Sequence, residues 1–305
     1  MPSGASAPYA STSRVRRSTG LSDRGSPTVR RRRLGQELRR LRERAALTGD
    51  QVAAQLGWSA AKVSRIETAK TSPRKADVEA LLEAYEVDSG QRQELLDLHR
   101  DAAKKGWWED YQSSLPHEYT TLLALEVEAT YARNWEPQVV PGLLQTEEYA
   151  LEIVKAAQPI TRFAQGGVRS RLEARMARQQ IILRDDQPLN LMVVLDESVL
   201  LRGFGDATVM RAQLDRLLSL SELPNIRIQV LPLDADHPVN TGSFLHLKFP
   251  EFHDVVYLES LFGARFVEEE ETVYGYEIAF DRLQAEALDV DASRDQIRKT
   301  IERWK

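Results

Sequence analysis

The sequence predicts a mostly α-helical N-terminal domain followed by an α+β domain. Residues 34–106 carry apolar side chains at helical spacings of three and four, separated by short polar turns. Residues 107–305 begin with helical patterns and continue with strand-sized apolar runs such as LMVVL. A chain of 305 residues has room for two such domains. We therefore expect boundaries near residues 33 and 106.

Charge is distributed unevenly along the chain. The whole chain carries a formal net charge of −5, but residues 1–33 hold eight arginines and one acid and carry +7. Residues 34–106 carry +1 and residues 107–305 carry −13. Residues 1–33 are rich in Ser, Arg, Gly, Pro and Thr, which predicts a disordered basic arm. That arm is either a solvated tail or a segment that contacts DNA, whereas phosphates would be repelled by the acidic C-terminal region.

Composition also excludes several classes of protein. The chain contains no cysteine, which excludes disulfides and thiolate metal sites and favours an intracellular protein. No apolar run approaches the roughly 20 residues that a membrane helix needs. We therefore expect a cytoplasmic protein without membrane contact.

The helices expected in residues 34–106 can be placed in order. Thr48 supplies an N-cap for the second helix, and Gly57 ends it because a residue without a Cβ allows a sharp turn. Ser59 caps the third helix, which extends to residue 69. Pro73 is expected in the first turn of the fourth helix, and the fifth starts at Gly90. The first helix is marked by apolar residues at Leu34, Leu38, Leu41 and Ala45.

The second and third helices have the pattern of a helix-turn-helix motif. Two short helices that cross steeply need a small residue at the crossing, here Ala53, and a glycine at the turn, here Gly57. In this motif the second of the two helices enters the DNA major groove. The alternative is an ordinary helical hairpin within a bundle. The inner positions are all apolar, namely Val52, Leu56, Trp58, Val63 and Ile66.

The segments LGQELRRLRERAALT and VAAQLGWSAAKVSRIE resemble the Xre family of helix-turn-helix regulators, whose domain is a five-helix, repressor-like fold. The resemblance implies that Arg42 pairs with Glu67 and that the third helix faces the groove. Two positions depart from the family pattern: Gly49 stands where a glutamine is usual, and Ala69 replaces the usual glycine after the reading helix. The predicted DNA-contacting residues are Ser59, Ala60, Ala61, Lys62, Ser64, Arg65, Thr48, Gln51 and Lys70.

The side chains of the third helix are suited to reading bases. Arg65 can donate two hydrogen bonds to guanine O6 and N7, and Lys62 can reach guanine or a phosphate. Ala60 or Ala61 can pack against a thymine methyl group, while the two serines can bond to phosphate or base. The alternative is that these polar residues form an ordinary solvated surface.

Residues 107–305 are expected to form a sheet covered by helices on at least one face. Helical patterns cover 118–135, 146–157, 169–183, 209–223 and 272–305. Strand-like runs cover 189–196, 226–233, 243–249 and 255–259.

No known catalytic or metal-binding motif appears in this half. Glu197 and Glu259 both end strand-like runs and are candidates for a pair of carboxylates, although acids at strand ends are common. A metal site is a further alternative, but acids beside histidines in loops are usually solvated. We expect no enzyme and no cofactor. The metal-ligand candidates are the acids and histidine of the segment DADH (Asp234, Asp236 and His237), with His246, His253 and Asp254.

The segment ARNWEPQVVPGLLQTEEYA, together with VVLDESVL, PNIRIQVLP and GSFLHLKFP, resembles the C-terminal domain of a large actinobacterial group of Xre regulators. That domain is described as antitoxin-like, and the resemblance implies pairing with small acidic partner proteins. It supplies no catalytic residue.

Together these patterns lead us to expect a sequence-specific transcriptional regulator. It would bind a double-stranded DNA operator as a homodimer through residues 59–69, and associate with the nucleoid when bound. The C-terminal domain would receive a small-molecule effector or a protein signal. The alternatives are an antitoxin-like protein that holds a small partner and regulates its own gene, and a catalytic C-terminal domain targeted to DNA.

Overall fold

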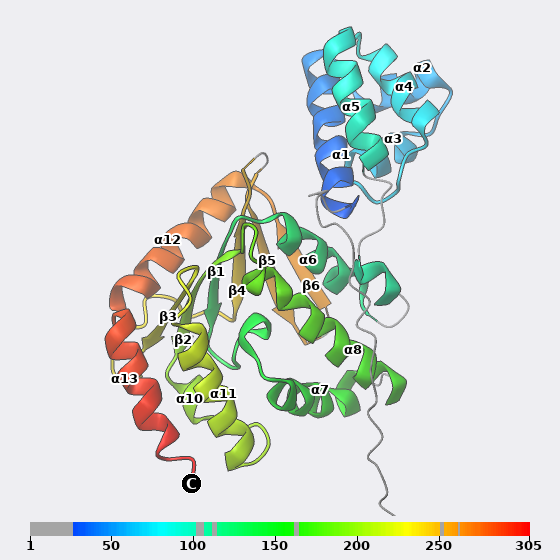
Figure 1. Cartoon of the computed structure of the whole chain (residues 1–305). Coiled ribbons are helices and arrows are strands. Elements are labelled where there is room, and N and C mark those ends of the chain that lie inside the picture. The colour runs from blue at the N-terminus through cyan, green and yellow to red at the C-terminus, as the bar shows by residue number, and fades with distance from the viewer. Residues whose placement is uncertain (1–26, 102–106, 112–114, 162–164, 251–252, 262) are drawn as a thin grey trace, which may run out of the picture.

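A computed structural model describes residues 27–101, 107–111, 115–161, 165–250, 253–261 and 263–305. The predicted fold class is confirmed: an N-terminal helical domain is followed by a domain with a mixed sheet and helices (Figure 1). The first 26 residues of the predicted basic arm lie outside the described ranges. In those ranges, no helix has both the length and the apolar character of a membrane span.

Helices α1 to α5 enclose the core of the N-terminal domain. This core is built from the periodic apolar residues of all five helices, including Leu38, Val52, Val63, Leu81 and Leu95. The helix bounds are α1 (Pro27–Arg44), α2 (Gly49–Leu56), α3 (Ala60–Glu67), α4 (Lys75–Ala84) and α5 (Ser89–Asp101).

Two predictions about helix starts were wrong. The first helix begins at Pro27 rather than Leu34, so residues 27–33 are helical and not part of a disordered arm. Proline fits the first position of a helix, and the arginines after it are good helix formers. Pro73 is buried before α4 and not within its first turn, because Arg74 is the N-cap residue.

Two caps and one glycine fix the turn between α2 and α3. Thr48 and Gln51 form a reciprocal capping box at the start of α2. Gly57 ends that helix with φ of 66°, a conformation that residues with a Cβ rarely adopt. The Ser59 Oγ accepts a hydrogen bond from the Lys62 backbone N–H at 3.2 Å and starts α3. The local sequence therefore fixes where α2 ends and where α3 begins.

A six-stranded sheet forms the centre of the C-terminal domain, in the order β3-β2-β1-β4-β5-β6 (Figure 1). Strands β1, β2 and β3 are parallel, and β4, β5 and β6 continue the sheet in antiparallel fashion from β1. The strand bounds are β1 (Tyr131–Glu136), β2 (Asn190–Asp196), β3 (Ile226–Leu231), β4 (Phe244–Lys248), β5 (Val255–Ser260) and β6 (Gly263–Val267).

The central strand β1 corrects the helix predicted over 118–135. Helix α6 (His117–Glu128) ends before Ala129, and the chain then enters the sheet. β1 pairs with β2 on one side and β4 on the other, so its backbone groups are satisfied by long-range partners. This pairing outweighs the helical periodicity of the same residues. Strand β6 was also not predicted.

Helices cover both faces of the sheet, whereas the sequence predicted helices on at least one face. Along β2, Leu191, Val193 and Leu195 pack with residues of α6, α7 and α11, whereas Met192 and Val194 pack with α12. Helix α13 lies against β3 and α11. The bounds are η1 (Trp107–Tyr111), η2 (Gly142–Leu144), α7 (Glu147–Thr161), α8 (Gln165–Arg178), α9 (Gln180–Leu183), α10 (Ser198–Leu201), α11 (Ala207–Leu220), α12 (Glu270–Glu286) and α13 (Val290–Ile301).

The two domains meet through α1, which packs on α6 and reaches β6. Arg32 forms an ion pair with Glu268, and its guanidinium carbon lies 5.0 Å from the centre of the Phe266 ring. Gln36 Nε2 donates to Glu268 Oε2 at 3.4 Å. Helix α1 of the N-terminal domain therefore rests on the C-terminal domain.

Candidate functional site

Helix α3 presents one face to the core and the opposite face to solvent. Val63 and Ile66 are 1% and 3% exposed and anchor the inner face. The outer face is made of small and polar residues, all of them exposed: Ala60, Ala61, Ser64 and Arg65. A helix with this division presents a flat, accessible surface of the size that fits a major groove.

An ion pair fixes the C-terminal end of α3 to α1. Arg42 Nε donates to Glu67 Oε1 at 2.7 Å, and its Nη2 donates to Glu67 Oε2 at 2.9 Å. The same guanidinium donates to the Leu47 carbonyl at 2.9 Å. The two side chains are only 13% and 7% exposed, so the pair is largely shielded from water. Hydrogen bonding to Glu67 outweighs burial and raises the pKa of Arg42, which keeps its guanidinium charged.

A close approach of α1 to α3 depends on Gly35, a residue that the sequence analysis did not single out. A Cβ at this position would lie 2.5 Å from the Glu67 carbonyl oxygen and 2.8 Å from that of Ile66. Both are backbone atoms, so neither can move aside. Only glycine allows α1 to pack here.

The structure gives several of the predicted DNA-contacting side chains a role inside the protein. Lys62 Nζ donates to Asp77 Oδ1 at 2.6 Å and lies 3.6 Å from the centre of the Trp58 ring. Three others cap helices, namely Thr48, Gln51 and Ser59. In contrast, the side chains of Ser64, Arg65 and Lys70 are exposed and make no hydrogen bond or ion pair with the described part of the chain.

Ala69, which departs from the family pattern, lies in the left-handed region with φ of 55°. Its backbone N–H donates to the Ile66 carbonyl at 3.0 Å and closes the last turn of α3. The backbone therefore takes the conformation that a glycine would adopt without strain, although the residue carries a Cβ. Gly49 begins α2 and has open space where a side chain would project.

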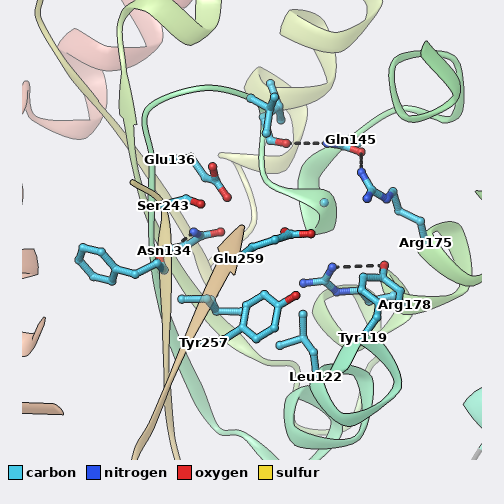
Figure 2. A pocket seen from close by; sticks show the side chains of 15 residues that line it. Tyr119, Leu122, Asn134, Glu136, Gln145, Arg175, Arg178, Ser243, Tyr257 and Glu259 are labelled. Atoms are coloured by element: carbon cyan, nitrogen blue, oxygen red, sulfur yellow. Dashed lines mark hydrogen bonds between the residues drawn. The ribbon is translucent and has the colours of Figure 1, made fainter. Parts of the chain in front are cut away.

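The C-terminal domain contains a cleft at the carboxyl ends of β1 and β5 (Figure 2). Its volume is about 760 Å³, with an inner recess of about 100 Å³. The strand order reverses here, because β2 and β3 continue on one side of β1 and β4 lies on the other. Ligands of open α/β sheets bind at such a reversal. Residues that line both parts include Tyr119, Glu136, Val139, Arg175, Ser243, Tyr257 and Glu259.

Glu136, at the end of β1, is the most strongly perturbed acid in this cleft. Burial and the negative charge of Glu259 raise its pKa to about 8, although a hydrogen bond from Asn134 and the charges of Arg178 and Arg175 oppose the shift. At neutral pH the Glu136 carboxyl is therefore mostly protonated. A strongly shifted acid in a cleft is a typical feature of a functional site.

A second buried ion pair lies below the recess. Arg178 Nε donates to Glu126 Oε2 at 2.6 Å, and a further contact joins its Nη2 to Oε1. These side chains are 9% and 1% exposed. Arg178 also reaches the Tyr119 hydroxyl at 3.5 Å, and Arg175 donates to Gln145 Oε1 at 2.8 Å (Figure 2). Helix α8 thus supplies the positively charged wall of the cleft.

The predicted pairing of Glu197 with Glu259 was wrong. Strands β1 and β4 separate the two residues, and Glu197 instead accepts hydrogen bonds from the Leu233 backbone N–H at 3.0 Å and Gln296 Nε2 at 2.6 Å. The acid that faces Glu259 is Glu136, which directly follows the predicted helix 118–135 and so gave no strand-end signal.

The histidines considered as metal ligands fall into separate pairs. His237 contacts Asp196 at 3.1 Å and His246 contacts Asp254 at 3.0 Å. His253 contacts Glu270, also at 3.1 Å. Among the residues that the structure describes, no group of three or more His, Asp or Glu side chains could hold a metal ion.

Comparison with known proteins agrees with this division into two domains. A model of a helix-turn-helix domain matches residues 33–95, the part that contains α2 and α3. No curated protein and no solved structure gives a significant match. A second family model, described as a domain of unknown function (DUF5753), matches residues 119–299. Since that match covers more than half of the chain, this protein belongs to the DUF5753 family, with its family domain placed behind a helix-turn-helix domain.

Proposed function

We propose that this protein is a sequence-specific transcriptional regulator that inserts α3 into the major groove of an operator. The observation that carries the proposal is Arg65, an exposed arginine on the outer face of α3 without a partner in the described residues. An unpaired guanidinium at this position of a helix-turn-helix domain is ready to donate to guanine O6 and N7. A side chain already paired within the protein would have to break that contact first.

The other exposed residues of α3 support this orientation. Ala60 and Ala61 allow close approach and can contact thymine methyl groups, while Ser64 and Lys70 can bond to phosphate or base. Lys62 has a different role in this proposal: its bond to Asp77 fastens α3 to α4. The helix-turn-helix domain match makes DNA the natural partner of this surface.

Dimerisation forms part of the proposal because one small domain covers only one half-site. The C-terminal domain, with its −13 charge, is repelled by phosphates and offers a large surface for association. We expect the full chain to be a dimer in light scattering and to bind DNA more tightly than a fragment of residues 1–106. A monomeric full chain, or equal affinity of the fragment, would contradict this part.

We further propose that the cleft receives a signal and has a binding role without catalysis. Two elements support communication with the DNA-binding domain. Helix α6 supplies Tyr119 to the cleft and packs on α1, and β6 supplies Ala264 to the cleft and Phe266 to the contact with Arg32. A ligand that moves α6 or β6 would therefore move α1 and, through Arg42, α3.

An antitoxin-like role is the second candidate. It is favoured by Tyr274 and Ile278, which are 62% and 39% exposed and lie one turn apart on α12. Such a ridge suits a protein partner. However, α12 is itself acidic, so a small acidic partner would be repelled from it.

Selection of bound duplexes from a random DNA pool tests the proposal. The full chain is expected to enrich a motif with two symmetric half-sites, about one helical turn apart between centres. Enrichment of no motif would overturn it. Enrichment of a single half-site without a repeat would support base recognition by α3 but would contradict dimeric binding.

A further inference from the structure

The cleft contains more acids than bases. Glu118, Glu136 and Glu259 line it, against Arg171 and Arg175. Arg178 does not balance the extra acid, because its charge is paired with that of the buried Glu126. Neither Glu136 nor Glu259 forms an ion pair with another described residue. With all these groups ionised, the site therefore lacks one positive charge.

Glu136 and Glu259 lie close together, so the missing positive charge is localised between them. Strands β1 and β5 run parallel on either side of β4, so their carboxyl ends reach the same edge of the sheet. Glu136 and Glu259 extend from these ends into the recess, and Glu259 lies beside Tyr257 (Figure 2). Two carboxylates beside an aromatic ring are a favourable environment for an organic cation.

The mouth of the cleft is apolar. Ile160 is 51% exposed and Leu261 is 60% exposed, and both line the outer part together with Val154. Large apolar side chains left open beside a polar recess suit a ligand with an apolar portion. The volume of about 760 Å³ is that of a small-molecule site.

We propose that the cleft binds a small organic cation, whose ammonium or amidinium group sits between Glu136 and Glu259 and whose apolar portion lies along Val154, Ile160 and Leu261. This inference rests on the proposed function, since it names the class of effector that the C-terminal domain would receive. An anion is disfavoured because it would face the Glu259 carboxylate and the buried Glu136, and Arg175 is already bonded to Gln145.

Binding of a cation should be linked to proton release. The charged and titratable groups that act on Glu136 are Glu259 from β5, Arg175 and Arg178 from α8, and Tyr149 from α7. The hydroxyl-bearing side chains of Tyr119 and Tyr257 line the same recess. Burial and the negative charge of Glu259 keep Glu136 mostly protonated at neutral pH, against the opposing charges of the two arginines. A cation favours the carboxylate, so its affinity should fall about tenfold for each pH unit below roughly 8 until the bound form is also protonated.

Calorimetric titration of the full chain without DNA tests this inference. The probes are 2-phenylethylamine and benzamidine as cations, 2-phenylethanol as the neutral analogue and 3-phenylpropanoate as the anionic one. Titrations at neutral pH in two buffers that differ in ionisation enthalpy report the released proton. We expect millimolar or tighter binding of at least one cation with proton release, and much weaker binding of the neutral and anionic probes.

Three variants define the site. Glu136→Gln keeps the shape of the protonated side chain but should weaken cation binding at least tenfold at about pH 8 and abolish proton release. Glu259→Gln should also weaken binding, whereas Glu147→Gln changes an exposed acid at the start of α7 and should bind like the wild type. Thermal unfolding of each variant verifies that it is folded.

Three results would overturn the inference: binding of neither cation, equal binding of the neutral or anionic analogue, or unchanged cation binding in the Glu136→Gln/Glu259→Gln double variant. Chemical conversion of a bound probe would contradict a sensing role of the cleft and indicate a catalytic one. Because DNA is absent from the titration, each of these results leaves the reading of DNA by α3 untouched.

Discussion

Among the described residues, each domain has one largely buried arginine–glutamate pair, and the two pairs support different kinds of site. Arg42–Glu67 joins α1 to the end of α3 and holds an exposed surface in place. Arg178–Glu126 joins α8 to α6 and holds one wall of an enclosed recess. In both cases the pair lies behind the surface that is proposed to bind a partner.

This difference shows how the same interaction depends on its surroundings. Arg42 and Glu67 remain 13% and 7% exposed, so water still shares in their solvation. Arg178 and Glu126 are 9% and 1% exposed and depend almost entirely on each other and on Tyr119. Loss of one partner should therefore be more harmful in the C-terminal domain than in the N-terminal one.

The largest expected effect is that of Arg178→Met. It leaves Glu126 buried without a counter-charge and should lower the free energy of unfolding of the C-terminal domain by roughly 3–5 kcal/mol. Denaturant unfolding followed by tryptophan fluorescence measures it. The matched control is Arg169→Met, because Arg169 forms an exposed pair with Glu173 on the same helix and should leave stability unchanged. Equal effects of the two variants would contradict the assigned burial.

The Arg42–Glu67 pair should show a somewhat smaller effect. Arg42→Met or Glu67→Met alone should cost about 3 kcal/mol, while the double change should cost less than either single change. Thermal or denaturant unfolding of the four chains completes the cycle. Additive losses would mean that the pair contributes no coupling energy, despite distances of 2.7 and 2.9 Å between its atoms.

Stability of the C-terminal domain should depend on pH through Glu136. Its folded-state pKa, about 8, lies above the ordinary value of 4.5, so the contribution is full below about pH 4.5 and is lost as pH rises through about 8. In that window the loss is at most about 1.4 kcal/mol per pH unit. Unfolding at about pH 6 and about pH 9 measures it, and Glu136→Gln should reduce the difference. An identical difference in both chains would reject the raised pKa.

The smallest expected effect concerns the end of α3. Ala69→Gly should raise stability by about 0.5–1 kcal/mol, because glycine adopts a φ of 55° without strain. Gly35→Ala should have the opposite effect. The added Cβ would clash with two carbonyl oxygens and should destabilise the N-terminal domain. A destabilising Ala69→Gly, measured by thermal unfolding, would mean that the Ala69 side chain has a packing role.

The N-terminal surface was predictable because its determinants are local. Thr48, Gly57 and Ser59 set the helix ends within a dozen residues, and Val63 and Ile66 give α3 its inner face by spacing alone. The internal bond of Lys62 to Asp77 was not predictable, because it joins side chains of two helices whose packing the spacing does not specify.

The cleft was not predictable, since its residues come from distant parts of the chain. Glu136 and Glu259 are separated by more than a hundred residues and meet only because β1 and β5 flank β4. Glu197 had an equally good strand-end signal, yet its strand lies on the other side of β1. Pairing order in a sheet, not the local pattern, decides which acids face each other.

The most direct test of the account is the titration of a selected operator and a scrambled duplex, at fixed salt, with wild-type, Arg65→Ala and Arg40→Ala chains. Arg40 is an exposed arginine of α1 outside the predicted DNA-contacting set and serves as the charge-matched control. We predict that Arg65→Ala loses about 1–3 kcal/mol of discrimination between the two duplexes, whereas Arg40→Ala keeps it. Unchanged discrimination in Arg65→Ala, with a folded protein, would contradict the reading of bases by α3.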